Sequence, residues 1–67
     1  MNITAPELLY QALGYIREWS PVYGKWYRAR LRVRGRVRYC RRKHRTAEGA
    51  DIYGLQLVQR LRERSES

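Results

Sequence analysis

The side chains whose types and spacing suggest a binding function are arginines and aromatic residues in the middle of the chain. In the run YRARLRVRGRVRY, residues 27–39, every even-numbered position is an arginine. A guanidinium presents a planar fork of donors that matches a phosphate, so the pattern indicates binding to an anion and above all to nucleic acid. Trp26 beside the run is a candidate for stacking on a base. The predicted nucleic-acid-binding residues are Lys25, Arg28, Arg30, Arg32, Arg34, Arg36, Arg38, Arg41, Arg42, Lys43 and Arg45.

The distribution of charge supports this interpretation. The 67 residues include 15 Lys and Arg against 6 Asp and Glu, a formal net charge of +9. Residues 19–47 hold no acid at all, so the excess positive charge lies in the central part of the chain. Charge of one sign at this density repels itself and raises the cost of folding, a cost that an anionic partner offsets.

Other chemistry is poorly supported by the sequence. His44 has no acid, nucleophile or further metal ligand near it in the sequence, so we expect no catalytic role, no metal site and no cofactor. Cys40 is the single cysteine and has no partner for an internal disulfide, which favours a reducing, cytoplasmic setting. No apolar run approaches the ~20 residues of a membrane span. We therefore expect a protein that is neither an enzyme nor a membrane protein.

The flanks of the arginine run predict two helices in a single small basic domain, residues 1–67. Residues 4–19 have apolar residues at three- and four-residue spacing, with Thr4 and Glu7 at the spacing of a capping box. Residues 46–64 repeat that spacing, with Thr46 as the expected N-cap. We expect residues 65–67 to be frayed. A domain of this size buries only about 60% of its unfolded surface, which makes a homodimer or folding against a partner an option.

The central segment, residues 25–42, predicts a β-hairpin because its apolar and charged residues alternate strictly. The alternation continues through Gly35, which favours a three-residue loop, 34–36. That loop pairs Val33 with Val37, and by the same register Leu31 with Tyr39 and Arg32 with Arg38. The expected fold class is α+β, a helix–β-hairpin–helix with an arginine-lined sheet face. Arginines on one strand are then about 6.6 Å apart, close to the phosphate spacing of nucleic acid.

An all-α arrangement is the alternative. At about 100° per residue, positions 22, 26, 29, 33, 37, 40 and 44 form a stripe without charge. This pattern is typical of a three-helix bundle with an arginine-rich central helix. Leu31 among the arginines and Gly35 inside the helix count against it.

Three short motifs carry a resemblance to a known family: Gly24-Lys25-Trp26, Val33-Arg34-Gly35-Arg36 and Thr46-Ala47-Glu48-Gly49-Ala50. Over about residues 24–61 the chain resembles the small sheet-plus-helix DNA-binding domain of ethylene-response factors and the arm-binding domain of tyrosine recombinases. The resemblance implies that Arg28, Arg30, Arg32, Arg36 and Arg38 face a DNA groove. The family's glycine after the second strand is missing, and an N-terminal helix is added. The helix–strands–helix order is also similar to double-stranded-RNA-binding domains, which have a third strand.

The leading functional prediction is a small non-enzymatic protein that binds nucleic acid, DNA favoured over RNA, through phosphate contacts. A regulator from a phage or another mobile element fits this size and charge. The alternative is an antirepressor, inhibitor or assembly factor whose basic face binds an acidic protein surface. A ribosomal or virion structural component is the third hypothesis.

Overall fold

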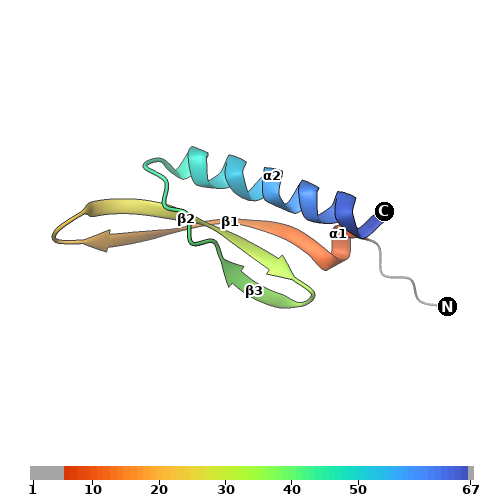
Figure 1. Ribbon diagram of the computed structural model, residues 1–67. Helices are drawn as coiled ribbons and strands as arrows, with labels where there is room; N and C mark the ends of the chain where they lie inside the picture. The colour runs from red at the N-terminus through yellow and green to blue at the C-terminus, as the bar shows by residue number, and fades with distance from the viewer. Residues whose placement is uncertain (1–5, 67) are drawn as a thin grey trace.

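The computed structural model describes residues 6–66, which form a three-stranded antiparallel sheet crossed on one face by a long helix (Figure 1). The order is α1 (Pro6–Leu9), β1 (Tyr10–Ser20), β2 (Gly24–Val33), β3 (Arg36–Tyr39) and α2 (Ala47–Glu66), and β2 lies between the other two strands. The α+β class is confirmed, and the three-helix alternative is wrong. The predicted N-terminal cap at Thr4 and the last residue of the predicted frayed tail, Ser67, lie outside the described residues.

The predicted helix over residues 4–19 is wrong beyond Leu9. Of its described residues only Pro6–Leu9 are helical, and Tyr10–Ser20 is an edge strand that pairs with β2 from Tyr10↔Val33 to Ser20↔Gly24. The hairpin predicted in the centre is therefore one half of a three-stranded sheet. Tertiary pairing along a full strand outweighs a local preference for helix, which is only a weak prior.

A β-bulge explains why β1 resembles a helix in the sequence. Ala12 pairs with Leu31 and Tyr15 pairs with Ala29, so Leu13 and Gly14 both lie opposite one residue of β2. Gly14 has φ +79°, a left-handed conformation that glycine adopts without strain. The extra residue shifts the strand's alternation by one. The step from Ala12 to Tyr15 is then three residues long, which mimics the spacing of a helix face.

The turn between β2 and β3 also differs from the prediction. It has two residues, Arg34 at φ 51° and Gly35 at φ 84°, as in a type I′ hairpin turn. The amide of Arg34 donates to the carbonyl of Leu9 at 2.8 Å, which anchors the turn to the start of β1. Val33 consequently pairs with Arg36, not with Val37.

The same register replaces the other predicted pairs, since Leu31 lies opposite Arg38 and Arg32 opposite Val37. A primed two-residue turn matches the right-handed twist of the strands, and this fit outweighs the pairing of apolar with apolar residues at an edge strand. All four residues of β3 are exposed, so its two faces differ little in burial.

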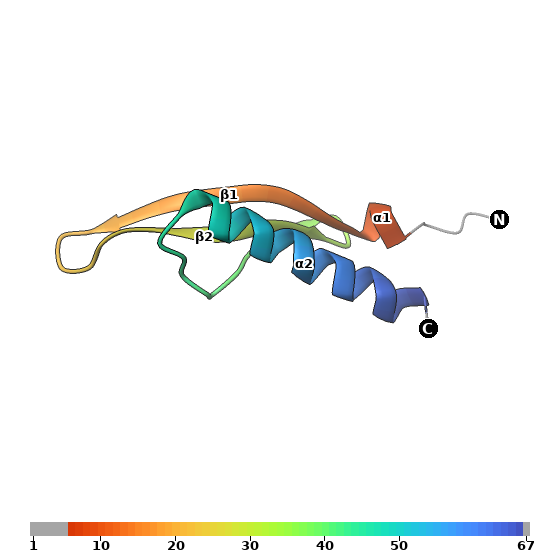
Figure 2. The ribbon, with the colours of Figure 1, turned by 90° about the horizontal axis from the view of Figure 1, so that it is seen from above.

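Helix α2 agrees with its prediction at the N-terminal end and runs two residues past the predicted end, so residues 65 and 66 of the expected frayed tail are helical. Thr46 caps it, since its Oγ1 accepts a hydrogen bond from the Gly49 amide at 3.0 Å. The helix lies over β1 and β2, and the β1–β2 hairpin extends past its N-terminal end (Figures 1 and 2). None of the helices in the described part of the chain is both long and apolar enough to cross a membrane.

The core beneath α2 is small. Ala29 and Ala50 are fully buried, and Leu31 and Val58 keep 3% of their surface exposed. Fully burying a Leu or Val side chain contributes only about 1.5–3 kcal/mol, so few such residues leave a narrow stability margin. Gly54 lets the helix approach the sheet, because a Cβ at this position would lie 3.2 Å from the Cβ of Ala29.

We predict that Gly54→Val destabilises the fold by about 1–3 kcal/mol, because the branched side chain is forced against β2. Chemical denaturation followed by circular dichroism measures the change. Gln56→Val is the matched control, since Gln56 is exposed on the same helix and carries the same β-branched penalty. Equal losses for the two variants would contradict close packing at Gly54.

Candidate nucleic-acid interface

The sheet face away from α2 carries three of the predicted arginines. Along β2, Arg28, Arg30 and Arg32 alternate with Ala29 and Leu31, whose side chains are buried under the helix. We call this surface the open face. By register it comprises Gln11, Ile16 and Glu18 of β1, Trp26, Arg28, Arg30 and Arg32 of β2, and Val37 and Tyr39 of β3.

The expectation that Arg36 and Arg38 project from the same face as the arginines of β2 is wrong. They pair with Val33 and Leu31, which places them on the helix side of the sheet. The two-residue turn causes this, because it moves every β3 side chain to the opposite face from the one a three-residue loop predicts. Both arginines are exposed at the β3 edge, which α2 does not cover. Arg34 lies in the turn itself and is also exposed.

Val37 and Tyr39 also lie on the opposite face of the sheet from the one that was predicted. The predicted three-residue loop pairs them with Val33 and Leu31, which lie on the helix side, but they lie on the open face, where 46% and 53% of their surfaces are exposed. Tyr27 does pack on the helix side, with its ring 5.6 Å from that of Tyr15 in an edge-on arrangement. The open face is therefore a mixture of guanidinium groups and exposed apolar side chains.

Strand β1 holds the open-face arginines in place. Glu18 Oε1 forms an ion pair with Arg28 Nε at 2.7 Å. The Arg30 Nε donates to the Leu13 carbonyl at 3.3 Å, and Arg32 Nη1 donates to Gln11 Oε1 at 3.4 Å. Leu13 is one of the two bulge residues, so the irregularity in β1 presents a backbone acceptor to Arg30. The Glu18–Arg28 pair is partly exposed, so it orients the guanidinium more than it stabilises the fold.

Trp26 is fixed at one end of the open face. Its indole Nε1–H donates to Glu18 Oε1 at 2.8 Å. The ammonium of Lys43 lies 4.4 Å from the centre of the Trp26 ring and 5.7 Å from that of Tyr23. Such cation–π contacts contribute about 0.5–1 kcal/mol at exposed sites. Trp26 is thus a ring held by its edge, with a cation over its plane.

The segment after β3 returns to the edge of β2 and carries several of the remaining predicted binding residues. The Cys40 amide donates to the Ala29 carbonyl at 2.9 Å, and His44 and Tyr27 exchange two backbone hydrogen bonds of 2.8 Å. Residues 41–43 leave the ladder between these two points. The predicted binding residues of this segment and of the start of β2 are all exposed: Lys25, Arg41, Arg42, Lys43 and Arg45.

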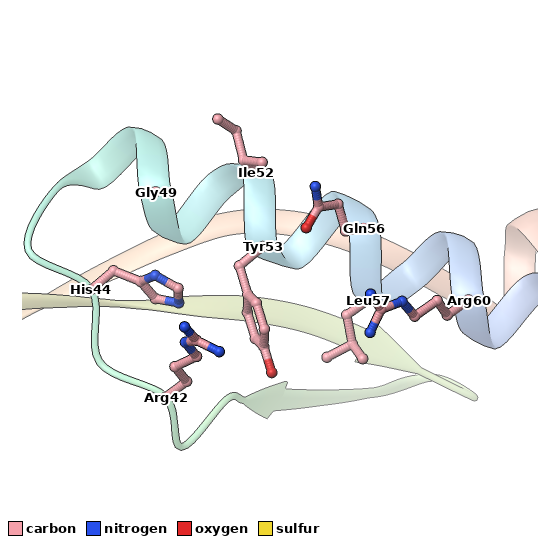
Figure 3. Close-up of a pocket in the computed structure, with 8 residues that line it drawn as sticks. All are labelled: Arg42, His44, Gly49, Ile52, Tyr53, Gln56, Leu57 and Arg60. Atoms are coloured by element: carbon pink, nitrogen blue, oxygen red, sulfur yellow. The ribbon is translucent and has the colours of Figure 1, made fainter.

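A second group of basic residues borders a cavity of about 330 Å³ on the helix side (Figure 3). Arg42 lies 5.5 Å from the centre of the Tyr53 ring, and the His44 ring lies 5.0 Å from it. Arg60 of α2 borders the same cavity. The Nε2 of His44 is buried and makes no hydrogen bond within residues 6–66. His44 therefore packs on α2.

The sequence interpretation missed the contribution of β1. Gln11 and Glu18 orient open-face arginines, yet both were placed on a helix. Gly14 is the signal that would have revealed them, because a glycine between two runs of opposite alternation is typical of a bulge.

The described residues form no metal site, and no known relative was found. In the part of the chain that the structure describes, no three His, Cys, Asp or Glu residues gather where they could hold a metal ion. Comparisons with protein-family models, curated proteins and solved structures found no match. The resemblance to ethylene-response and recombinase DNA-binding domains therefore stays a prediction.

The packing of Cys40, directly after β3, leads to a prediction about the reactivity of its thiol. Burial raises the pKa of its thiol above the ordinary value. Because the thiolate is the reactive form, we expect iodoacetamide to alkylate Cys40 more slowly in the folded protein, with a rate that rises at higher pH than in the unfolded chain. The neutral thiol is favoured in the fold, so its contribution to stability is lost as the pH rises through the raised pKa.

The measurement is the alkylation rate between pH 7 and pH 10, with the same protein in denaturant as control. Identical pH profiles in the two states would show that the Cys40 side chain does not pack against the core around Leu31.

Proposed function

We propose that this protein is a small, non-enzymatic nucleic-acid-binding protein that favours DNA and presents the open face of its sheet to the major groove. The observation that carries the proposal is the composition of that face. Arg28, Arg30 and Arg32 are aligned on one strand, Lys43 lies over Trp26 beside them, and Glu18 is the only acid on the face within residues 6–66.

The dimensions of the sheet support a groove contact. The major groove of B-DNA admits a two-stranded β-ribbon. Beside Trp26 and Arg28 the strands of the described sheet are β1 and β2 alone, because β3 pairs with β2 only from Arg30 to Val33. The sheet belongs to an elongated molecule with extents of 51 × 18 × 14 Å, so the open face is long and narrow.

The apolar side chains on the open face favour DNA over RNA. Ile16, Val37 and Tyr39 lie among the arginines. Apolar side chains in the major groove contact the methyl group of thymine, while arginine pairs with guanine. The major groove of A-form RNA is too narrow for such contacts.

The basic residues beyond the open face are assigned to phosphates. Lys25, Arg34, Arg41 and Arg45 are exposed at the two ends of the hairpins and in the segment after β3, whereas Arg42 lies over the Tyr53 ring on the helix side. Contacts of this kind position a protein on nucleic acid and carry no sequence information themselves. This set of phosphate-binding residues fits a regulator from a phage or mobile element that acts in the cytoplasm.

An acidic protein surface is the second candidate partner, in which case the chain is an inhibitor or assembly factor. One observation favours it: Arg36 and Arg38 point to the helix side, away from the open face. Pull-down from a lysate before and after nuclease digestion separates the candidates, because a complex bridged by nucleic acid is lost and a protein complex persists.

We predict that binding to duplex DNA weakens steeply with salt, by about 0.9 in log affinity per log salt for each neutralised phosphate. Because Arg30 and Arg32 are proposed to contact bases, the double variant Arg30→Gln/Arg32→Gln should weaken binding by about 1–3 kcal/mol per arginine and relax the preference for guanine, with a smaller change in the slope. The matched control is Arg36→Gln/Arg38→Gln, which removes the same charge from the other side of the sheet.

Fluorescence anisotropy across a salt series measures both variants. A larger loss in the Arg36/Arg38 control, or a slope near zero in the unmodified protein, would contradict groove binding through the open face.

We also predict that Glu18→Gln strengthens DNA binding by about threefold to tenfold at low salt, since it removes the acid from the open face. Glutamine retains an acceptor for the Trp26 indole, so the ring stays anchored. Glu63→Gln on the exposed side of α2 is the control for net charge. Weaker binding of Glu18→Gln would mean instead that the ion pair with Arg28 is needed to orient the guanidinium.

A further inference from the structure

The end of the sheet near the β1–β2 turn contains a second cavity, of about 480 Å³. It lies where residues 43–45 run beside the start of β2, next to the backbone pair of Tyr27 and His44. Its volume falls within the range of about 300–1,000 Å³ that is usual for small-ligand sites. Two aromatic rings and three cations line it together with His44: Tyr23, Trp26, Lys25, Lys43 and Arg45.

We propose that this cavity binds a single unpaired nucleotide of the nucleic acid that the open face engages. The proposal rests on the proposed function and names a substructure, a single-stranded tail or a bulge, that the protein would prefer. A site for one unpaired nucleotide needs a flat aromatic platform and cations at the distance of a backbone phosphate. The cavity brings both together from segments about twenty residues apart in the sequence.

The Trp26 ring is suited to be the platform. Its indole N–H donates a hydrogen bond to Glu18 Oε1 at 2.8 Å, so the ring is held by its edge. The faces of the ring do not pack on the core cluster around Leu31. Tyr23, in the turn, keeps 79% of its surface exposed and offers a second ring near the same cation. A base between or beside these rings would be stacked without any change in the strands.

In the unbound protein the ammonium of Lys43 lies over the face of the Trp26 ring, 4.4 Å from the ring centre. Its contact with Trp26 is weaker than base–aromatic stacking on the same ring. A base therefore displaces the ammonium, which lies on a flexible side chain and can pair with the phosphate of the same nucleotide. Lys25 and Arg45 are exposed at the rim for the neighbouring phosphates.

The open face and the cavity are continuous at Trp26, since this residue belongs to both. Duplex in contact with Arg28 and Arg30 would place a single-stranded tail or an extruded nucleotide next to the cavity. The two sites thus predict a preference for duplex with an unpaired extension over either blunt duplex or single strand alone.

The test uses the intrinsic fluorescence of Trp26 in the full-length Trp19→Phe variant. Trp19 is 69% exposed, so this background removes the other tryptophan at little cost to the fold. The probes are a blunt duplex of about 16 base pairs, the same duplex with a short single-stranded thymidine tail, and oligothymidylate of about 12 nucleotides. Trp26 also belongs to the open face, so blunt duplex should change its emission to some extent. We expect oligothymidylate and the tailed duplex to quench Trp26 much more strongly than the blunt duplex does.

Two further substitutions separate stacking from folding. Trp26→Leu should weaken binding of oligothymidylate by about 5- to 150-fold, and Trp26→Phe should restore most of it, as expected for a stacking ring. Tyr23→Ser, at an exposed turn position, should weaken the same binding without a change in melting temperature. For both Trp26→Leu and Tyr23→Ser, the loss for blunt duplex should be much smaller than for oligothymidylate.

The outcomes distinguish this inference from the proposed function. Salt-dependent binding of blunt duplex, with no quenching of Trp26 by the tail or by oligothymidylate, overturns the nucleotide site and leaves the open-face contact intact. Equal losses for blunt duplex and oligothymidylate in Trp26→Leu and Tyr23→Ser also overturn it. Quenching by oligothymidylate without any duplex binding supports the cavity and overturns the groove contact.

Discussion

The close approach of α2 to the middle of β2 is the constraint on which the rest of the structure depends. Gly54 lies against Ala29 and Leu31, and no larger side chain fits between the helix and the sheet without displacement. This contact decides which face of β2 is covered. Because neighbouring side chains on a strand point to opposite faces, covering Ala29 and Leu31 leaves Arg28, Arg30 and Arg32 uncovered. The location of the basic surface is thus a consequence of the core.

Folding such a surface requires that its charges be accommodated before any partner is bound. Arginines about 6.6 Å apart on one strand repel one another. Here each open-face guanidinium has a partner on β1: Arg28 forms an ion pair with the Glu18 carboxylate, and Arg30 and Arg32 donate hydrogen bonds to the Leu13 carbonyl and the Gln11 amide oxygen. Strand β1 therefore does more than widen the sheet, since it orients the groups proposed to bind.

The turn between β2 and β3 gives the molecule two different basic surfaces. A type I′ turn of Arg34 and Gly35 sets β3 one residue out of the register that would align all the arginines. The open face gains the exposed Val37 and Tyr39 in exchange for Arg36 and Arg38. Exposed apolar groups among guanidiniums can contact bases as well as phosphates, so the exchange favours a surface with some capacity for sequence recognition.

By itself the sequence determined the α+β class, the central hairpin, helix α2 with its cap at Thr46, and the concentration of positive charge in residues 25–45. These follow from local rules, namely strict alternation, capping and helical spacing. Pairing with β2 decided that residues 10–20 are a strand, because the bulge at Gly14 interrupts the alternation and leaves that glycine as the local signal. Tertiary structure alone decided the faces of Arg36, Arg38, Val37 and Tyr39, because a turn one residue shorter reverses every side chain after it. The cavity at Trp26 was equally hidden, since it forms only when residues 43–45 return beside β2.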